Sequence, residues 1–380
     1  YPLDEALSLP HRSFSDWVQQ RLSELTLVMP YGDAVNIWSR WLGWTLSKRS
    51  SEQLNTDHGE WVRDYDQVRE NAEVPPEACI LVISADGKGI PMTRQDSPPP
   101  EARRGRGQNK TAKKESTITA SYAIAPYPRT SDDIIQALVP DSNSSDTPKK
   151  VRPTPVDKQL FGTLQGQEAA FDHLVEQVSR REHSQVRHRV ALTDGNRGLK
   201  KRVQQHFPHF TLIIDIIHVT EYLWEVANTL LGETHAMRDT WMRDALRCVL
   251  DDDLDRLLDH LDYQFLRVSS KKQAIVKKVR RYLRNNRQHM DYQSYLAHGY
   301  PIGTGVIEGA CRHLVKDRFE QAGMRWSKLG AQVMLDLRAT FLNGDWDDFQ
   351  RFRRHQAHQQ RYSSSHPDII PEDIMMSVAA

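Results

Sequence analysis

Hydrophobic residues recur at helical spacing through the first part of the chain. Three runs show this spacing: residues 16–25, 33–42 and 60–71. Asp16 and Asp33 stand where a carboxylate often caps a helix. Pro75-Pro76 follows, and proline cannot continue a helix. The pattern predicts a small helical domain over residues 1–74, with three tryptophans in its core: Trp38, Trp41 and Trp44.

Beyond residue 75 the hydrophobic residues come in short continuous runs. Four of these runs predict buried strands: residues 78–85, 117–124, 190–193 and 210–214. The first and third lead directly into Asp-Gly, which indicates a turn after each of these strands. Amphipathic helices are expected at 166–182 and 197–206, whereas residues 139–156 are rich in Pro, Ser and Asp and predict a loop or linker. This alternation of strands and helices indicates an α/β core.

The rest of the pattern is helical. Residues 219–298 keep helical periodicity almost throughout, and a tight turn at 301–305 precedes further helices. The predicted organisation is a helical domain at 1–74, a first part of the core at 75–218, an all-helical insertion at 219–299, C-terminal core helices at 300–362 and a loose tail at 363–380.

The overall charge does not by itself identify a partner. The 380 residues include 51 Lys and Arg and 50 Asp and Glu, a formal net charge of +1, so nucleic-acid binding requires local basic patches. No run of about 18 apolar residues occurs, which excludes a transmembrane helix. The three cysteines lie far apart, which favours buried thiols in a reducing compartment over a disulfide framework or a structural zinc site: Cys79, Cys248 and Cys311.

Three acidic residues stand out by their context. Asp86 and Asp194 each follow an apolar strand, and Glu308 lies in the first helical turn after a Gly-rich turn. In α/β folds the carboxyl ends of strands carry ligands and catalytic groups. Three carboxylates that meet there suit Mg²⁺ or Mn²⁺, and a pair of such ions activates a hydroxyl and stabilises the leaving oxygen of a phosphodiester. The simpler alternatives are turn-forming Asp-Gly pairs and an acid that favours the positive end of a helix dipole.

Several motifs occur in one order along the chain. They are Asp86-Gly87-Lys88-Gly89, the stretch 193–199 beginning Thr-Asp-Gly-Asn-Arg-Gly, the stretch 215–223 beginning Asp-Ile-Ile-His, the stretch 300–311 beginning Tyr-Pro-Ile-Gly-Thr-Gly-Val-Ile-Glu-Gly, and Gly323-Met324-Arg325-Trp326. Together they resemble the DDE transposases of bacterial insertion sequences, specifically the ISKra-four family, which is related to the Mutator-like and hAT-like group. The resemblance extends from about residue 2 to 350, and the segment from Tyr300 to Trp326 is its most specific part.

The resemblance implies a ribonuclease-H-like core interrupted by a helical insertion before the last catalytic acid. It implies that Asp86, Asp194 and Glu308 are catalytic and hold two Mg²⁺ (or Mn²⁺) ions. Asp215 and His218 match an Asp-x-x-His signature of the wider group, and we expect them to organise the pocket. Their spacing of three would let a helix beginning there aim both side chains one way. The alternative for His218 is a satisfied histidine beneath the sheet.

Two basic stretches are candidate DNA contacts. The window 267–287 has no acidic residue, and the second stretch is a basic loop at 103–114. Phosphate contacts of this kind position DNA without specifying its sequence. Arg325 and Trp326 are further candidates, for a phosphate and an unpaired base, although such a tryptophan is more often in a core. The candidates in the first window are Lys271, Lys272, Lys277, Lys278, Arg280, Arg281 and Arg284, accompanied by Arg267 and Arg287.

The resemblance further implies an activity and its partners. The chain would cleave double-stranded DNA at transposon ends and transfer the strand into target DNA, as a homo-oligomer, at least a dimer, in the bacterial cytoplasm at the nucleoid. The helical domain at 1–74 would bind DNA or mediate dimerisation. Relatives usually carry a zinc-ribbon-like segment upstream, so the alternative is an inactive or domesticated DNA-binding or dimerising remnant. An ordinary two-carboxylate hydrolase is the second alternative, against which the basic window argues.

Overall fold

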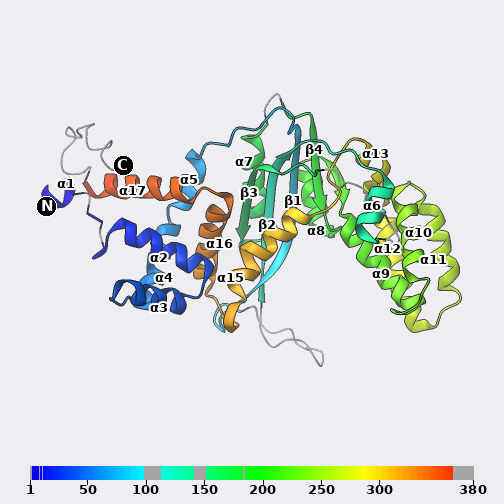
Figure 1. Ribbon diagram of the computed structural model, residues 1–380, viewed down its shortest axis with the longest axis horizontal. Coiled ribbons are helices and arrows are strands. Elements are labelled where there is room, and N and C mark those ends of the chain that lie inside the picture. The colour runs from blue at the N-terminus through cyan, green and yellow to red at the C-terminus, as the bar shows by residue number, and fades with distance from the viewer. Residues whose placement is uncertain are drawn as a thin grey trace. The chain divides into compact units, whose positions relative to one another are not determined.

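The computed structural model describes residues 2–7, 9–10, 12–97, 113–140, 151–182 and 185–362. The chain divides into two compact units. The helical unit comprises residues 1–70, 90–113 and 314–380, and the sheet unit comprises residues 71–89 and 114–313 (Figure 1). The predicted tail at 363–380 lies outside the described residues, and so does the basic loop from 103 to 112.

The helical unit is built from short and medium helices. They are α1 (Pro2–Ala6), α2 (Asp16–Val28), α3 (Tyr31–Leu42), α4 (Lys48–Gly59), α5 (Val62–Val68), α15 (Asp317–Phe319), η3 (Gln321–Gly323), α16 (Lys328–Asn343) and α17 (Trp346–Tyr362). The prediction that Asp16 and Asp33 cap helices was wrong. Ser15 is the N-cap of α2, where its hydroxyl accepts from the Val18 amide, and Asp33 lies inside α3. Helix α4 was missed because its polar sequence carries only one large apolar residue, Leu54.

The core of the helical unit contains one of the three tryptophans predicted there. Trp38 is 2% exposed and packs with Leu22 and Leu54, but Trp41 is 70% exposed and Trp44 is 37% exposed. The prediction was therefore wrong for Trp41, which lies on the outer side of α3, three residues after Trp38. Helical periodicity defines an apolar stripe, but it does not define how wide a stripe the neighbouring helices cover.

Two buried arginines hold the C-terminal end of α2. Arg318 Nε donates to the Thr26 carbonyl at 2.8 Å, and Arg338 donates to the Leu27 carbonyl through a terminal guanidinium nitrogen and to Leu314 O at 3.1 Å through Nε. The last carbonyls of a helix have no partner within the helix, so these bonds satisfy them. Burial lowers the pKa of both Arg318 and Arg338 to about 10.

The sheet unit contains a mixed five-stranded sheet in the order β3-β2-β1-β4-β5. The strands are β1 (Ile80–Pro91), β2 (Lys113–Ile124), β3 (Val156–Thr163), β4 (His188–Thr193) and β5 (Thr211–Ile214). β4 pairs in parallel with both β1 and β5, and β3 pairs antiparallel with β2. The prediction of an α/β class is confirmed. The sequence reading missed β3, an edge strand of mixed polarity, and the short helix α6 (Ser131–Leu138) that precedes it.

The turn predicted at Asp86-Gly87 is not present, because β1 continues through it to Pro91. The neighbouring strand β2 accounts for the extension. Ser116 Oγ on β2 donates to the Lys88 carbonyl at 2.7 Å, and a Cβ on Gly87 would lie 3.1 Å from the Glu115 carboxyl group. Pairing with β2 therefore keeps this segment extended, and Gly87 permits the close approach. The turn predicted at Asp194-Gly195 is correct, since β4 ends at Thr193 and Gly195 has φ +88°.

Helices cover both faces of the sheet. Leu81 and Ile83 of β1 pack with residues of α7 (Gln167–Ser179) and α8 (Arg197–His206), whereas Ile80 and Val82 belong to the core that includes α9 (Ile216–Leu230). The strand alternation therefore places even-numbered β1 side chains on the α9 face. A sheet buried on both faces explains why these strands are continuous apolar runs in the sequence.

The helices expected across 219–298 are present. They are α9, α10 (Arg238–Leu250), α11 (Leu254–Phe265), α12 (Ser270–Asn286), η1 (Arg287–His289) and α13 (Tyr292–Ala297), followed by α14 (Gly305–Ala310) and the π-helix η2 (Cys311–Lys316). Helices α9 to α12 form a bundle, in which consecutive helices contact each other and α12 closes the ring against α9. Across the described part of the chain, none of the helices has the length and hydrophobicity needed to cross a lipid bilayer.

Candidate functional site

Three aspartates fall at the same level of three neighbouring strands. Strands β1 and β4 are in register at Ser84 and Leu192, so Asp86 and Asp194, two positions further on, are equivalent. Strands β4 and β5 are in register at Thr193 and Ile214, so Asp194 and Asp215 are equivalent as well. Neighbouring strands lie about 4.8 Å apart. The register therefore brings together acids that are far apart in sequence, at the α9 face of the sheet.

Asp194 sits in a tight turn that the insertion helps to hold. The Asn196 amide donates to Asp194 Oδ1 at 2.7 Å, and the Tyr282 hydroxyl of α12 donates to the Asp194 carbonyl at 3.0 Å. A side chain at Gly195 would approach Tyr282 to 3.0 Å, so this approach requires glycine as well as a positive φ. Burial raises the pKa of Asp194, and the nearby Asp86 carboxylate raises it further. Two acids that oppose each other's ionisation favour the presence of a cation.

Asp86 is fixed by two hydrogen bonds. The Gly87 amide donates to Asp86 Oδ1 at 2.6 Å, and the Cys311 thiol donates to Asp86 Oδ2 at 3.3 Å. Cys311 is buried, and burial together with the negative charge of Asp86 raises the pKa of its thiol. The thiol therefore stays protonated and acts as a donor. It comes from the first position of the π-helix η2, three residues after Glu308.

Asp215 is fully buried, and both of its oxygens are used by the protein. Oδ1 accepts from the Ile217 amide at 3.0 Å and from the Thr304 amide at 3.2 Å. Oδ2 accepts from the Thr304 hydroxyl at 2.6 Å and lies 2.8 Å from His218 Nδ1. Four donors fill the lone pairs of a carboxylate. With both oxygens engaged by the protein, Asp215 has little capacity to bind an ion directly.

His218 carries its charge at neutral pH. Its hydrogen bond with Asp215 raises its pKa to about 9, while burial opposes the shift. The ring is one-third exposed, and its other nitrogen, Nε2, is not the one that Asp215 engages. A cation consequently stands beside the aspartates, with Nδ1 engaged by Asp215.

Glu308 reaches the same region from α14. The turn before this helix is tied to α9, because the Ile216 amide donates to the Ile302 carbonyl at 2.9 Å. The Thr304 hydroxyl lies 3.1 Å from Glu308 Oε1 as well as 2.6 Å from Asp215 Oδ2. A hydroxyl has a single proton, so Thr304 donates to one of the two carboxylates at a time. Thr304 thus connects the exposed glutamate to the buried aspartate.

The ligand atoms of these acids differ in how closely they approach one another. Among the described residues, Asp215, His218 and Glu308 form a group whose ligand atoms all lie within 4.8 Å of one another, whereas Asp86, Asp194 and Glu308 do not form such a group. One ion therefore does not suit the predicted trio in this arrangement. A pair of ions about 4 Å apart spans a wider set of oxygens. The hard oxygen donors and the raised pKa of Asp194 fit such a pair.

Sequence reasoning missed three members of this site. They are Thr304 between two carboxylates, Cys311 on Asp86, and Tyr282 on the Asp194 backbone. The spacing of Glu308 and Cys311 was an available signal, because residues three apart on a helix share a face. Tyr282 lies 88 positions from Asp194, and no local pattern connects the two.

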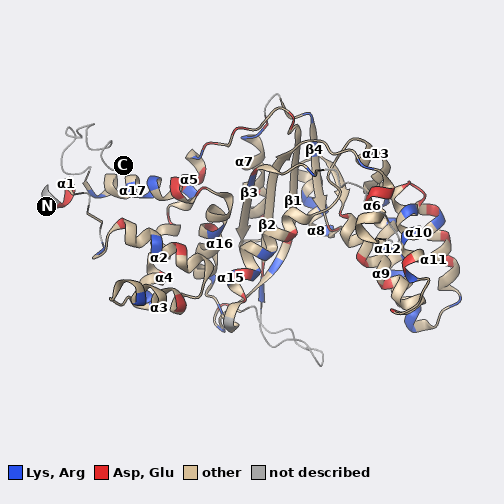
Figure 2. Ribbon diagram, in the orientation of Figure 1, with Lys and Arg blue, Asp and Glu red and all other residues tan. Residues whose placement is uncertain are grey.

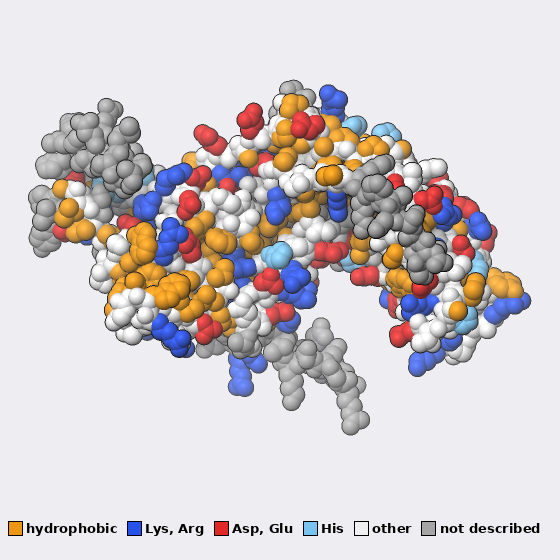
Figure 3. All heavy atoms as spheres, in the orientation of Figure 1, with side chains coloured by type: hydrophobic (Ala, Val, Ile, Leu, Met, Phe, Trp, Pro, Cys, Tyr) orange, Lys and Arg blue, Asp and Glu red, His pale blue; other side chains and the backbone are white. Residues whose placement is uncertain are grey.

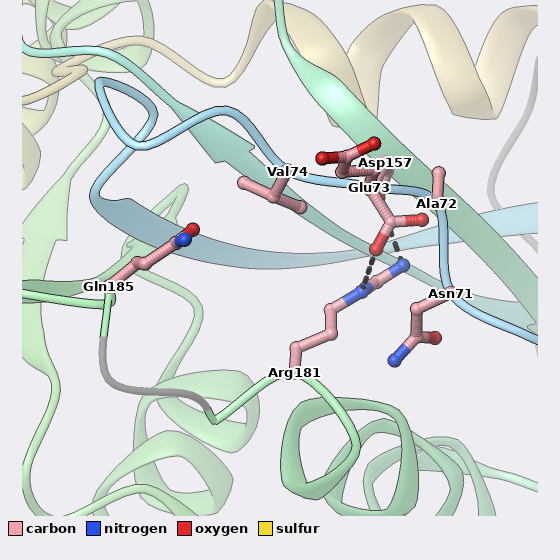
Figure 4. Close-up of a pocket in the computed structure, with 7 residues that line it drawn as sticks. All are labelled: Asn71, Ala72, Glu73, Val74, Asp157, Arg181 and Gln185. Carbon is pink, nitrogen blue, oxygen red and sulfur yellow. Dashed lines mark hydrogen bonds and ion pairs between the residues drawn. The ribbon is translucent and has the colours of Figure 1, made fainter.

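Two other features of the sheet unit lie apart from these aspartates. Glu168, Asp172 and His206 form a second group with ligand atoms within 4.8 Å, but Arg202 pairs with Glu168 there and supplies the counter-charge. A cavity of about 230 Å³ is lined by none of the predicted site residues (Figure 4). Its lining residues are Asn71, Ala72, Glu73, Val74, Asp157, Arg181 and Gln185.

The basic window covers the α11–α12 connection, α12 and η1, and acids on neighbouring helices compensate much of its charge. Figure 2 shows acidic and basic residues interspersed over this bundle. Lys278 pairs with Glu225 at 2.7 Å, Arg280 and Arg284 pair with Asp262, and Arg287 pairs with Asp255. The window itself contains no acid, and its counter-charges come from acids on the neighbouring helices α9 and α11. In the part of the chain that the structure describes, Lys271, Lys272, Lys277 and Arg281 have no such acid partner and are exposed.

Arg325 and Trp326 differ in accessibility. Arg325 is exposed, but Trp326 is only 6% exposed. The Trp326 ring packs on Phe319 with centroids 4.7 Å apart, the Arg318 guanidinium lies 4.8 Å from its centre, and its indole nitrogen donates to the Phe319 carbonyl. The expectation that Trp326 stacks on an unpaired base is corrected by this burial, and its role is in the core of the helical unit.

Comparisons with known proteins identify no family. No family model matches the chain, and no curated protein matches it. A solved structure of the Drosophila P element transposase strand transfer complex is similar with 10% sequence identity and a TM-score of 0.29, covering 91% of this chain and 81% of that one. A score of this size carries no argument about fold or function.

Proposed function

We propose that this chain is a metal-dependent DDE-type transposase that cleaves DNA at transposon ends and joins the freed strand to target DNA. The observation that carries the proposal is the register of Asp86 and Asp194 on neighbouring parallel strands, with Glu308 held nearby through Thr304. The mixed sheet, with helices on both faces and a helical block before Glu308, is compatible with the ribonuclease-H-like core implied by the sequence motifs.

The proposed division of labour follows from the contacts. Asp86, Asp194 and Glu308 would hold two Mg²⁺ or Mn²⁺ ions, which supply activation of a hydroxyl and stabilisation of a leaving oxygen when bound. Gly87, Cys311 and Asn196 fix the orientation of the two aspartates. Asp215 orients His218 and Thr304 and need not touch the substrate. His218 brings a positive charge to a site that must accept a phosphodiester.

The test is strand cleavage and strand transfer with purified protein. The substrate is a labelled duplex that carries a transposon end, with Mg²⁺, Mn²⁺ or EDTA. We expect nicking and joining with either metal and none with EDTA, and we expect Asp86→Asn and Glu308→Gln to abolish both reactions. Asp172→Asn is the matched control, because Asp172 belongs to the other acidic group, on α7. Binding without cleavage under any divalent metal would instead identify a DNA-binding remnant.

The proposed assembly has its own test. The proposed assembly is a homo-oligomer, at least a dimer, that holds two transposon ends. Light scattering of the protein–DNA complex should then give a mass of two or more chains. A monomeric protein on a single end under cleaving conditions would contradict that assembly and leave the cleavage test unaffected.

A further inference from the structure

The end of the helical bundle farthest from the sheet exposes hydrophobic side chains. The bundle alternates in direction through short connections, so the α9–α10 and α11–α12 connections lie at the same end. Leu266 in the second connection is 80% exposed, Tyr263 is 50% exposed, and Met237 in the first is 55% exposed. Figure 3 shows hydrophobic and basic side chains beside each other on this part of the molecule.

Cations surround the exposed leucine. Arg267 follows it directly, with its guanidinium 4.0 Å from the centre of the Tyr263 ring, and Lys271 and Lys272 are exposed in the first turn of α12. No acidic residue occurs between Tyr263 and Lys278 in the sequence. The acids nearest this end are on the adjoining helices: Asp262, one residue before Tyr263, pairs with Arg280 and Arg284, and Asp239 at the start of α10 pairs with Arg238 at 3.3 Å. Glu233 in the first connection is exposed.

The start of α12 has no side chain that offsets the partial positive charge of its amides. The N-cap residue Ser269 makes no capping hydrogen bond with its side chain, and the first turn contains no acid. The amides there point outward with partial positive charge, which favours a phosphate and disfavours the two lysines. Lysines near the N-terminus of a helix are unfavourable, because the helix dipole is positive there. An unfavourable local choice of this kind is expected where a bound anion offsets the repulsion.

We propose that the α11–α12 connection is a DNA-binding surface, in which Arg267, Lys271 and Lys272 contact phosphates and Leu266 enters the groove between base steps. DNA as the partner rests on the proposed function. Proteins that bend DNA use an apolar side chain in this way, flanked by cations that hold the backbone. Within the basic window, this turn is where exposed cations without an acid partner stand beside an exposed apolar side chain, as far as the described residues show.

The experiment measures binding of the full chain to a duplex of 40 base pairs with random sequence, in EDTA, over a range of KCl concentrations. Lys271→Ala with Lys272→Ala is expected to reduce the slope of log Kd against log salt by about 2, since each phosphate contact contributes about 0.9. The control is Arg152→Ala with Lys158→Ala, which removes the same charge from exposed positions of the sheet unit. Equal slopes for the two double variants would overturn the proposal.

The leucine is tested separately by bending. Energy transfer between dyes at the duplex ends reports the bend, and Leu266→Ala is expected to lose it and to weaken binding about fivefold at an unchanged salt slope. Leu266→Met should keep both properties, because methionine also serves as an apolar wedge. Unchanged bending and affinity in Leu266→Ala would overturn the wedge, and so would loss of binding to phosphatidylserine vesicles with no loss on DNA.

Failure here is distinguishable from failure of the proposed function. These measurements contain no divalent metal and do not involve Asp86 or Glu308. If no strand is cleaved but the Lys271, Lys272 and Leu266 variants still change DNA binding and bending as expected, the transposase activity alone is rejected. Normal cleavage and affinity in all the variants at this turn would reject this surface alone.

Discussion

Asp86 Oδ2 accepts a hydrogen bond from the thiol of Cys311 at 3.3 Å. This contact connects a strand of the sheet to the π-helix η2, which directly follows the helix that carries Glu308, over 225 positions of sequence. It gives a buried cysteine a defined role in orienting a proposed metal ligand, in addition to packing.

Replacing Cys311 should separate orientation from packing. Cys311→Ser keeps a donor of similar size, and we expect it to retain most of the cleavage rate. Cys311→Ala removes the donor, and we expect kcat to fall about tenfold with little change in the KM for DNA, because Asp86 is no longer fixed. The measurement is single-turnover cleavage in Mg²⁺. Equal rates for the two variants would assign Cys311 to packing alone.

The hydroxyl of Thr304 should stabilise the fold as well as the site. Thr304→Val keeps the shape but removes the donor to Asp215, which leaves a buried carboxylate oxygen with one partner fewer. We expect the free energy of unfolding to fall by about 1–3 kcal/mol. Thr304→Ser should recover most of it. Denaturant titration followed by circular dichroism gives the comparison, and a valine variant as stable as the wild type would contradict this assignment.

The charge on His218 should depend on Asp215. In the wild type the pKa of His218 is about 9, and Asp215→Asn is expected to bring it down towards the ordinary value near 6.5. NMR titration of the ring protons in EDTA measures this. A His218 pKa that is unchanged in Asp215→Asn would show that other groups hold the proton.

The same pair sets a pH dependence of stability. Because the folded-state pKa is raised, the contribution is fully present below about pH 6.5 and is lost as the pH rises to about 9. The free energy of unfolding should therefore fall over this window in the wild type, and it should fall less in His218→Asn. Parallel curves for the two proteins would contradict the linkage.

The two aspartates should govern catalysis and not binding. Asp194→Asn removes a carboxylate whose pKa is raised by burial and by Asp86, so it relieves repulsion while removing a proposed ligand. We expect no detectable cleavage, a slightly higher melting temperature without metal, and DNA affinity within about twofold of the wild type. Isothermal titration with Mn²⁺ should show weaker binding. Loss of DNA affinity equal to the loss of cleavage would contradict this separation.

The sequence predicted the buried strands better than the turns and edge strands around them. The apolar runs before Asp194 and Asp215 gave strand positions correctly, because burial on both faces leaves a continuous hydrophobic signal. The Asp86-Gly87 pair was misread as a turn, since the partner that keeps this segment extended is β2, whose Ser116 lies 28 positions from Lys88. Edge strand β3 was missed because half-exposed, polar strands lack that signal.

Convergence of the acids was predictable only in outline. The Asp-x-x-His contact is local, and the spacing of three was enough to expect both side chains to point one way. The pairing of Lys278 with Glu225 and of Arg284 with Asp262 joins different helices, so a search along the window could not find the compensating acids. The burial of Trp326 is decided in the same way by Phe319 and Arg318 around it.

The bond between Asp215 and Thr304 spans 89 positions, and the whole helical bundle is encoded between them. During synthesis a ribosome therefore releases the three aspartates long before the turn that brings Glu308. A nascent chain holding only the strands would carry a row of acids without its last member. Completion of the proposed metal site is consequently a late event in the synthesis of each molecule, and an unfinished polypeptide carries the site without Glu308.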